Sequence, residues 1–158
     1  MNGKVLLLQY HGKVTVMNSK PANRNVVLEM TNQGKILIVE DEKVIREFMC
    51  KLLISLNYQV DTTCDGIEAV NKIKNTEYSV ILSDVKMPRM SGIELLKRVK
   101  EINKNIEVIL ITGFPNIEDA EKSIQLGAYA YTKKPIKIKN LIKLLNRIFK
   151  KTDSAEYV

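Results

Sequence analysis

The segment Val-Ile-Leu-Ser-Asp-Val-Lys-Met-Pro-Arg-Met-Ser-Gly, residues 80–92, decides the fold of this chain. Its apolar start, Val80 to Leu82, is too short and too β-branched for a helix of its own, so it predicts a buried strand. Apolar residues then recur at helical spacing from Gly92 to Ile102, which predicts a helix after the loop. Asp84 thus stands between a strand and a helix, as in a parallel sheet with crossover helices.

The same alternation continues on both sides of this segment. Apolar runs predict further strands near residues 36–39, 58–61, 106–111 and 129–132. Helical spacing predicts further helices near residues 44–56, 66–73, 117–126 and 138–149. Residues 35–150 are therefore predicted to form a three-layer α/β domain around a doubly wound, five-stranded parallel sheet with right-handed connections.

Two of the predicted helices have a clear apolar face. In the first helix this face consists of Val44, Ile45, Phe48, Met49, Leu52, Leu53 and Leu56. In the last helix we expect the apolar residues to be buried, and these are Ile138, Leu141, Ile142, Leu145, Ile148 and Phe149.

Length and composition bound the class of protein. The 158 residues, of which 45% are hydrophobic and 27% charged, fit one soluble domain with an appendage and exclude wholesale disorder. Cys50 and Cys64 are too few for a disulfide framework, which favours a reducing, cytoplasmic location. Since no stretch approaches the ~18 apolar residues of a membrane span, we expect no membrane insertion.

The first 34 residues do not follow the strand and helix rhythm. Val5 to Tyr10 and Lys13 to Met17 could pair as a hairpin around His11-Gly12. Two interpretations stay open: residues 1–34 are a functional extension, or they are a non-native start or linker before a natural beginning at Met30. Residues 151–158 are expected to be a C-terminal tail.

Polar side chains follow four of the five predicted strands. Glu40 and Asp41 follow the first, Asp84 the third, Thr112 the fourth, and Lys133-Lys134-Pro135 the fifth. Each alone has an ordinary explanation such as helix capping, but together they mark one edge of the sheet, where open α/β sheets bind ligands. Carboxylates converging there repel one another unless a cation lies among them, and Mg²⁺ is the first candidate. The hydroxyl and the lysine suit a phosphoryl group.

Five stretches carry a resemblance to a known family. They are Ile-Leu-Ile-Val-Glu-Asp-Glu (36–42), Asp-Gly-Ile-Glu-Ala (65–69), the segment 80–92 quoted above, Ile-Leu-Ile-Thr-Gly (109–113) and Gly-Ala-Tyr-Ala-Tyr-Thr-Lys-Lys-Pro (127–135). Over residues 35–150 the chain resembles the receiver domain of two-component response regulators, such as those of chemotaxis. The resemblance implies a flavodoxin-like sheet with strand order 2-1-3-4-5.

The resemblance also implies an acceptor and a metal site. Asp84 would accept a phosphoryl group from a histidine kinase or a phosphotransfer protein. Asp41, Asp84 and the backbone carbonyl of Lys86 would hold Mg²⁺, and Glu40 would reach the ion through water. Such a receiver is a switch in a phosphorelay rather than an enzyme, since it promotes only its own phosphorylation and dephosphorylation.

Further positions follow from the same resemblance. Lys134 would pair with the phosphoryl oxygens, while Lys133 has no assigned role. Thr112 would hydrogen-bond the phosphoryl group, and Tyr131 would change rotamer with it. Lys86 and Phe114 lie at positions that flank the path of the hydrolytic water in the family, so they would set the lifetime of the phosphoryl group.

Partners follow from the charge pattern and the resemblance together. We expect a downstream protein target, or a homodimer through the last two helices and the last strand. The basic stripe Lys139, Lys143 and Arg147 could suggest DNA, but Lys150 to Val158 is too short for a helix-turn-helix, so this chain alone is not expected to bind nucleic acid. Two alternatives stay open: a hydrolase of phosphate esters, and a receiver fragment of a longer transcriptional regulator or hybrid histidine kinase.

Overall fold

The computed structural model describes residues 5–10, 13–18 and 34–154, with side chains from 34 to 150. It contains two units, residues 1–33 and 34–158. In the first, β1 (Val5–Tyr10) and β2 (Lys13–Asn18) pair antiparallel. The predicted turn at residues 11–12, the alternative start at Met30 and the chain end after residue 154 lie outside the described residues, so the role of the first 34 residues stays a prediction.

The second unit is built on a five-stranded parallel sheet of order β4-β3-β5-β6-β7. The strands are β3 (Ile36–Val39), β4 (Val60–Thr63), β5 (Val80–Asp84), β6 (Glu107–Thr112) and β7 (Ala130–Lys133). Counted within this unit, the order is 2-1-3-4-5, which confirms the predicted flavodoxin-like α/β fold.

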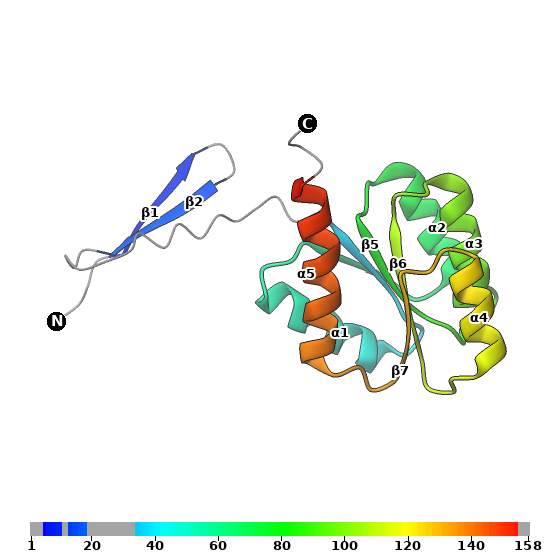
Figure 1. Cartoon of the computed structure of the whole chain (residues 1–158). Coiled ribbons are helices and arrows are strands. Elements are labelled where there is room, and N and C mark those ends of the chain that lie inside the picture. The colour runs from blue at the N-terminus through cyan, green and yellow to red at the C-terminus, as the bar shows by residue number, and fades with distance from the viewer. Residues whose placement is uncertain (1–4, 11–12, 19–33, 155–158) are drawn as a thin grey trace. The chain divides into compact units, whose positions relative to one another are not determined.

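Helices cover both faces of this sheet (Figure 1). They are α1 (Lys43–Ser55), α2 (Gly66–Asn75), α3 (Gly92–Ile102), α4 (Ile117–Gln125) and α5 (Ile138–Ser154). One core cluster joins the sheet to α1 and α5 through residues such as Leu53 and Leu145, and the other joins it to α2 and α3 through Ala69 and Leu96. Among the described residues, no helix is long and apolar enough to cross a membrane.

Strand β4, the second strand of this sheet along the chain, begins later than predicted. The sequence suggested a strand from Tyr58, whereas β4 starts at Val60. The reason is the end of α1: Asn57 has a φ of 66°, and the N–H of Tyr58 donates to the carbonyl of Leu53 at 3.1 Å. The chain therefore closes the helix before it becomes extended.

The expected burial of the apolar face of the last helix is wrong at Ile138, the first residue of α5, which is 45% exposed. In α1, Met49 and Leu53 are buried, whereas Val44 and Phe48 of its apolar face are 79% and 60% exposed. At its other end, α5 runs past residue 150 to Ser154, since no Gly or Pro interrupts the helical pattern there.

Candidate functional site

The carboxyl edge of the parallel sheet gathers four charged side chains. Glu40 and Asp41 follow β3, Asp84 is the last residue of β5, and Lys134 follows β7. Oxygens of the three carboxylates lie within 4.8 Å of one another. The ammonium of Lys134 lies 2.8 Å from Glu40 Oε2 and 2.5 Å from Asp84 Oδ2. The structure thus brings together residues that the sequence placed at this edge.

Burial makes the charges of this cluster interdependent. Glu40 and Asp84 are 2% and 8% exposed. Burial raises the pKa of Glu40, and the contact with Lys134 offsets this only in part. Burial lowers the pKa of Lys134, but hydrogen bonds and charge from Asp84 and Glu40 outweigh it and raise the pKa above its usual value. Lys134 is therefore cationic at neutral pH and acts as the counterion of the cluster.

The donor set of the cluster fits a hard divalent cation. Three carboxylates from adjacent strands offer only oxygen ligands, which Mg²⁺ prefers. The backbone N–H of Lys86 donates to Asp84 Oδ1 at 3.1 Å, so the loop after β5 lies beside the same carboxylate. A second acidic group, Cys64, Asp65 and Glu68, does not fit as well, because Asp65 already caps α2 and pairs with Arg89.

Thr112 and Tyr131 lie on neighbouring strands of the site. Thr112 is fully buried at the end of β6, and its Oγ1 accepts the N–H of Phe114 at 3.1 Å. Tyr131, on β7, packs against the core, and its buried hydroxyl has no hydrogen-bond partner within the described part of the chain. Because a buried hydroxyl without a partner costs about 1–3 kcal/mol, this position of the Tyr131 side chain is not strongly favoured.

Sequence reasoning missed Arg46. Its Nη1 donates to the backbone carbonyls of Glu40 and Asp41 at 2.6 and 3.1 Å, so α1 holds the loop that carries the acidic pair. A long cation one turn into the helix that follows an acidic pair was the available signal. Only the folded geometry shows that the guanidinium reaches back to these carbonyls.

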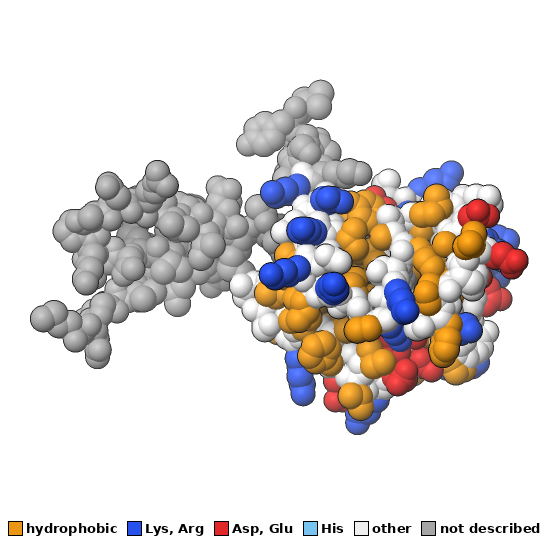
Figure 2. Space-filling model, turned by 60° about the horizontal axis from the view of Figure 1, so that its bottom comes forward, with side chains coloured by type: hydrophobic (Ala, Val, Ile, Leu, Met, Phe, Trp, Pro, Cys, Tyr) orange, Lys and Arg blue, Asp and Glu red, His pale blue; other side chains and the backbone are white. Residues whose placement is uncertain are grey.

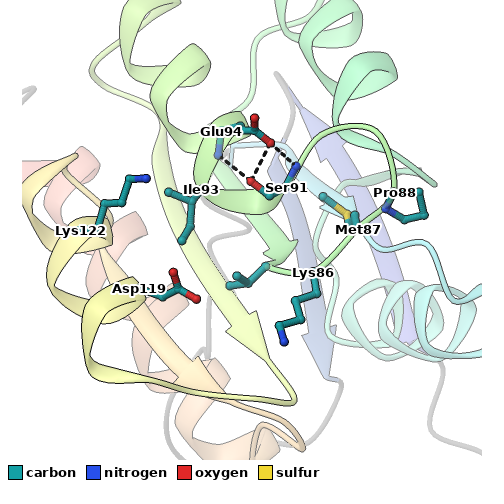
Figure 3. A pocket seen from close by; sticks show the side chains of 9 residues that line it. Lys86, Met87, Pro88, Ser91, Ile93, Glu94, Asp119 and Lys122 are labelled. Carbon is teal, nitrogen blue, oxygen red and sulfur yellow. Dashed lines mark hydrogen bonds between the residues drawn. The ribbon is translucent and has the colours of Figure 1, made fainter.

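A cavity of about 620 Å³ adjoins the site on the side of α4 (Figure 3). Its walls come from the loop after β5, the start of α3 and α4, as the labelled Lys86, Ser91 and Asp119 show. The ammonium of Lys86 also lies 4.8 Å from the centre of the Phe114 ring. Lys86 and Phe114 are therefore in contact at the edge of the site.

Together, the fold and this edge define a class of protein: a flavodoxin-like α/β domain with an acidic cluster and a lysine at the carboxyl ends of its strands. A family model described as the response regulator receiver domain matches residues 36–146. The chain belongs to this family, and phosphoryl transfer in two-component signalling is the function of the family.

Known relatives agree with this assignment. Sporulation initiation phosphotransferase F of Bacillus subtilis is 36% identical over 104 residues, which cover 66% of this chain and 84% of the relative. A receiver domain protein from Methanospirillum hungatei superposes with a TM-score of 0.75 at 27% identity, covering 78% and 99% of the two chains.

Two further relatives differ in length and assembly. The beryllofluoride-activated NtrC4 receiver domain dimer matches with a TM-score of 0.70 and 32% identity, over 74% of this chain and 97% of that one. The response regulator MprA of a Mycobacterium species is 25% identical over 77% of this chain, and the match spans only 53% of that regulator. The chain thus covers about half the length of longer relatives of this kind.

Proposed function

We propose that Asp84 of this receiver domain accepts a phosphoryl group from a histidine kinase or a phosphotransfer protein in a Mg²⁺-dependent reaction. One observation carries the proposal: a buried carboxylate at the end of the central strand is held by a lysine ammonium at 2.5 Å, beside two further carboxylates. A carboxylate in this setting can act as a nucleophile, and the lysine ammonium beside it can pair with the oxygens of an incoming phosphoryl group.

In the proposed step, a carboxylate oxygen of Asp84 forms a bond to phosphorus while the bond from phosphorus to the donor nitrogen breaks. Lys134 would give up its contact with Asp84 and bind a phosphoryl oxygen, and its ammonium would neutralise the negative charge of that oxygen. Asp41, Asp84 and the Lys86 carbonyl would hold Mg²⁺, with Glu40 acting through water, and the ion supplies charge neutralisation in the transition state. Thr112 would then donate its hydroxyl to the phosphoryl group.

The donor would dock beside α1. A cavity of about 520 Å³ is lined mostly by apolar side chains, and Lys134 lines it as well: the set is Val44, Ile45, Phe48, Met49, Ile111, Lys134, Pro135 and Ile136. Because Lys134 contacts both Asp84 and this groove, a partner seated there could present a phosphohistidine to Asp84. The exposed Phe48 would provide the main apolar contact.

The acceptor is tested with a small phosphodonor and intact-mass measurement. We expect one added phosphoryl group in the wild type, none in Asp84→Asn, and none after chelation of Mg²⁺. Asp119→Asn, which changes an acid on α4 outside the cluster, is the matched control and should be labelled normally. Undiminished labelling of Asp84→Asn would overturn the assignment.

A second candidate is that this receiver controls a DNA-binding output domain. The observation that favours it is the match to only 53% of the regulator MprA. The two candidates share Asp84 and differ in the output. Determining the full reading frame around this chain, followed by footprinting of the whole product, separates them.

A further inference from the structure

The loop between β5 and α3, residues 85–91, determines how Asp84 is presented. It runs from Lys86 past Pro88 to Ser91 (Figure 3). The backbone N–H of Lys86 binds Asp84 Oδ1, and the Lys86 carbonyl is the proposed metal ligand. The geometry of the acceptor therefore depends on what holds this loop.

Arg89 adopts an unfavourable backbone conformation within the loop. Its φ is 68°, in the left-handed region that costs a residue with a side chain about 1–2 kcal/mol. An interaction elsewhere has to stabilise that conformation, and the side chain of Arg89 supplies one.

The partner of Arg89 is a carboxylate that is itself fixed. The guanidinium Nη2 donates to Asp65 Oδ2. The other oxygen of Asp65 accepts the N–H groups of Ile67 and Glu68 at 2.8 and 3.0 Å, which caps the first turn of α2. Since Asp65 is 6% exposed, its orientation is set by the helix rather than by solvent.

Close packing fixes both ends of the loop. A Cβ at Gly92 would collide with the carbonyl oxygen of Asp84, and the N–H of Gly92 donates to Val85 at 2.9 Å. A Cβ at Gly66 would lie 2.9 Å from Met90, so α2 and the loop are in direct contact. The pair of Arg89 with Asp65 is a polar tie from the middle of the loop to the start of α2.

We propose that Arg89 is a positioning residue for the phosphoacceptor: by pairing with the α2 cap Asp65, it holds the loop so that the Lys86 backbone faces Asp84 and Mg²⁺. The inference rests on the proposed function of Asp84. It adds that the affinity for Mg²⁺ depends on a contact between the loop and α2.

The sign of the effect distinguishes positioning from simple electrostatics. Removing a positive charge near an acidic cluster should, by Coulomb attraction alone, strengthen the binding of a cation. Loss of a group that orients a metal ligand should weaken it. Replacement of Arg89 therefore changes Mg²⁺ affinity in opposite directions under the two explanations.

The test is a Mg²⁺ titration of the full chain without phosphodonor. Arg89→Ala should raise the Kd about tenfold, the lower end of the range for groups that orient a metal ligand. Arg98→Ala is the control, because its side chain is 62% exposed against 60% for Arg89 and pairs with Glu101 on α3. The control should leave the Kd unchanged. In metal-free protein, the Lys86 amide resonance should shift in Arg89→Ala only.

A double-mutant cycle and a rescue complete the test. Asp65→Asn, which keeps a capping side chain, should weaken Mg²⁺ binding as Arg89→Ala does. The variant that carries both changes should bind Mg²⁺ no more weakly than either single variant. Arg89→Lys should recover part of the affinity. An unchanged or lower Kd for Mg²⁺ in folded Arg89→Ala would overturn this inference but leave the proposed function of Asp84 standing. Failure of the wild type to bind Mg²⁺ would overturn the proposed function, and this inference with it.

Discussion

At the scale of single residues, the site balances three carboxylates against one lysine. Glu40 is the residue for which this balance is least favourable, because burial raises its pKa despite the contact with Lys134 at 2.8 Å. The metal-free domain therefore carries a cost in folding free energy that a bound cation would relieve.

The first prediction concerns the pH dependence of stability in metal-free protein. A carboxyl group with a raised folded pKa stabilises the fold most below its unfolded pKa, near 4.5, and this contribution is lost as the pH rises through the folded value. The wild type therefore retains less of this contribution at pH 7 than at pH 4. Glu40→Gln should therefore raise the unfolding midpoint by a few degrees at pH 7 and by less at pH 4, as measured by thermal melts. A lower midpoint at pH 7 would contradict this reading of Glu40.

The second prediction concerns the lifetime of the phosphoryl group. The ammonium of Lys86 packs on the Phe114 ring at 4.8 Å, and such a contact contributes about 0.5–1 kcal/mol at an exposed site. Phe114→Ala removes this contact and would give water easier access to the proposed phosphoryl group, so dephosphorylation should become roughly 2–5-fold faster. The measurement is the decay of labelled protein after removal of the donor, with Ile117→Ala as a control on α4. Equal decay in wild type and Phe114→Ala would show that this contact does not limit water.

At the scale of elements, α4 is the helix with the weakest hold on the core. Its buried residue is Ser123, whereas Ile117 and Ile124 are 77% and 59% exposed. The cavity of about 620 Å³ adjoins it, so α4 has room to shift. Weakly packed elements are those that move in switches.

The third prediction links α4 and β7 to the site. Thr112→Ala should leave phosphorylation of Asp84 largely intact, because Thr112 is not the nucleophile. It should reduce the conformational response, because in the proposed coupling the Thr112 hydroxyl would move toward the phosphoryl group and free space for Tyr131. Chemical shifts of α4 and β7 with and without beryllium fluoride give the readout. Equal shift changes in both proteins would rule out the coupling.

The fourth prediction concerns the apolar groove beside α1. Phe48→Ala should reduce phosphotransfer from a histidine-containing partner about tenfold, since exposed aromatic anchors carry much of the binding energy of interfaces. Phosphorylation by a small donor, which needs no docking, should stay unchanged. Ile54→Ala, at another exposed position of α1 outside the groove, is the control. A parallel loss with both donors would place the defect in the site and not in docking.

At the scale of the whole molecule, the sequence predicted the order of the elements well. Short apolar runs such as Ile36 to Val39 are buried on both faces, so hydrophobicity alone identifies them as central strands. Glu40, Asp84 and Lys134 could be predicted as a cluster because parallel strands end at a common edge.

What escaped prediction depends on contacts distant in sequence. The exposure of Val44 and Phe48 depends on how far α1 extends over the sheet, which periodicity does not reveal. The pairing of Arg89 with Asp65 joins residues of different elements through flexible side chains. Helices and strands can be predicted from local sequence patterns. Contacts between side chains of different elements, such as Arg89 with Asp65, can be seen only in the folded structure.

The last prediction concerns the surface formed by α4, β7 and α5. Basic side chains gather on one part of the surface (Figure 2). On α5, Lys139, Lys143 and Arg147 are exposed. Acidic residues lie in the first turn of α4, at Glu118 and Asp119. Across a two-fold axis, the basic patch of one copy can meet the acidic patch of the other.

We therefore expect beryllium fluoride to promote a dimer of this chain, measured by analytical ultracentrifugation. The double variant Lys143→Glu and Arg147→Glu should remove dimerisation but not Mg²⁺ binding, because neither residue lies in the acidic cluster. The same stripe could bind DNA only through phosphates, with each contact adding about 0.9 to the salt slope, so little affinity should remain at physiological salt. Sub-micromolar, sequence-selective binding of duplex DNA by this chain would reverse the choice of protein over nucleic acid as the partner of this surface.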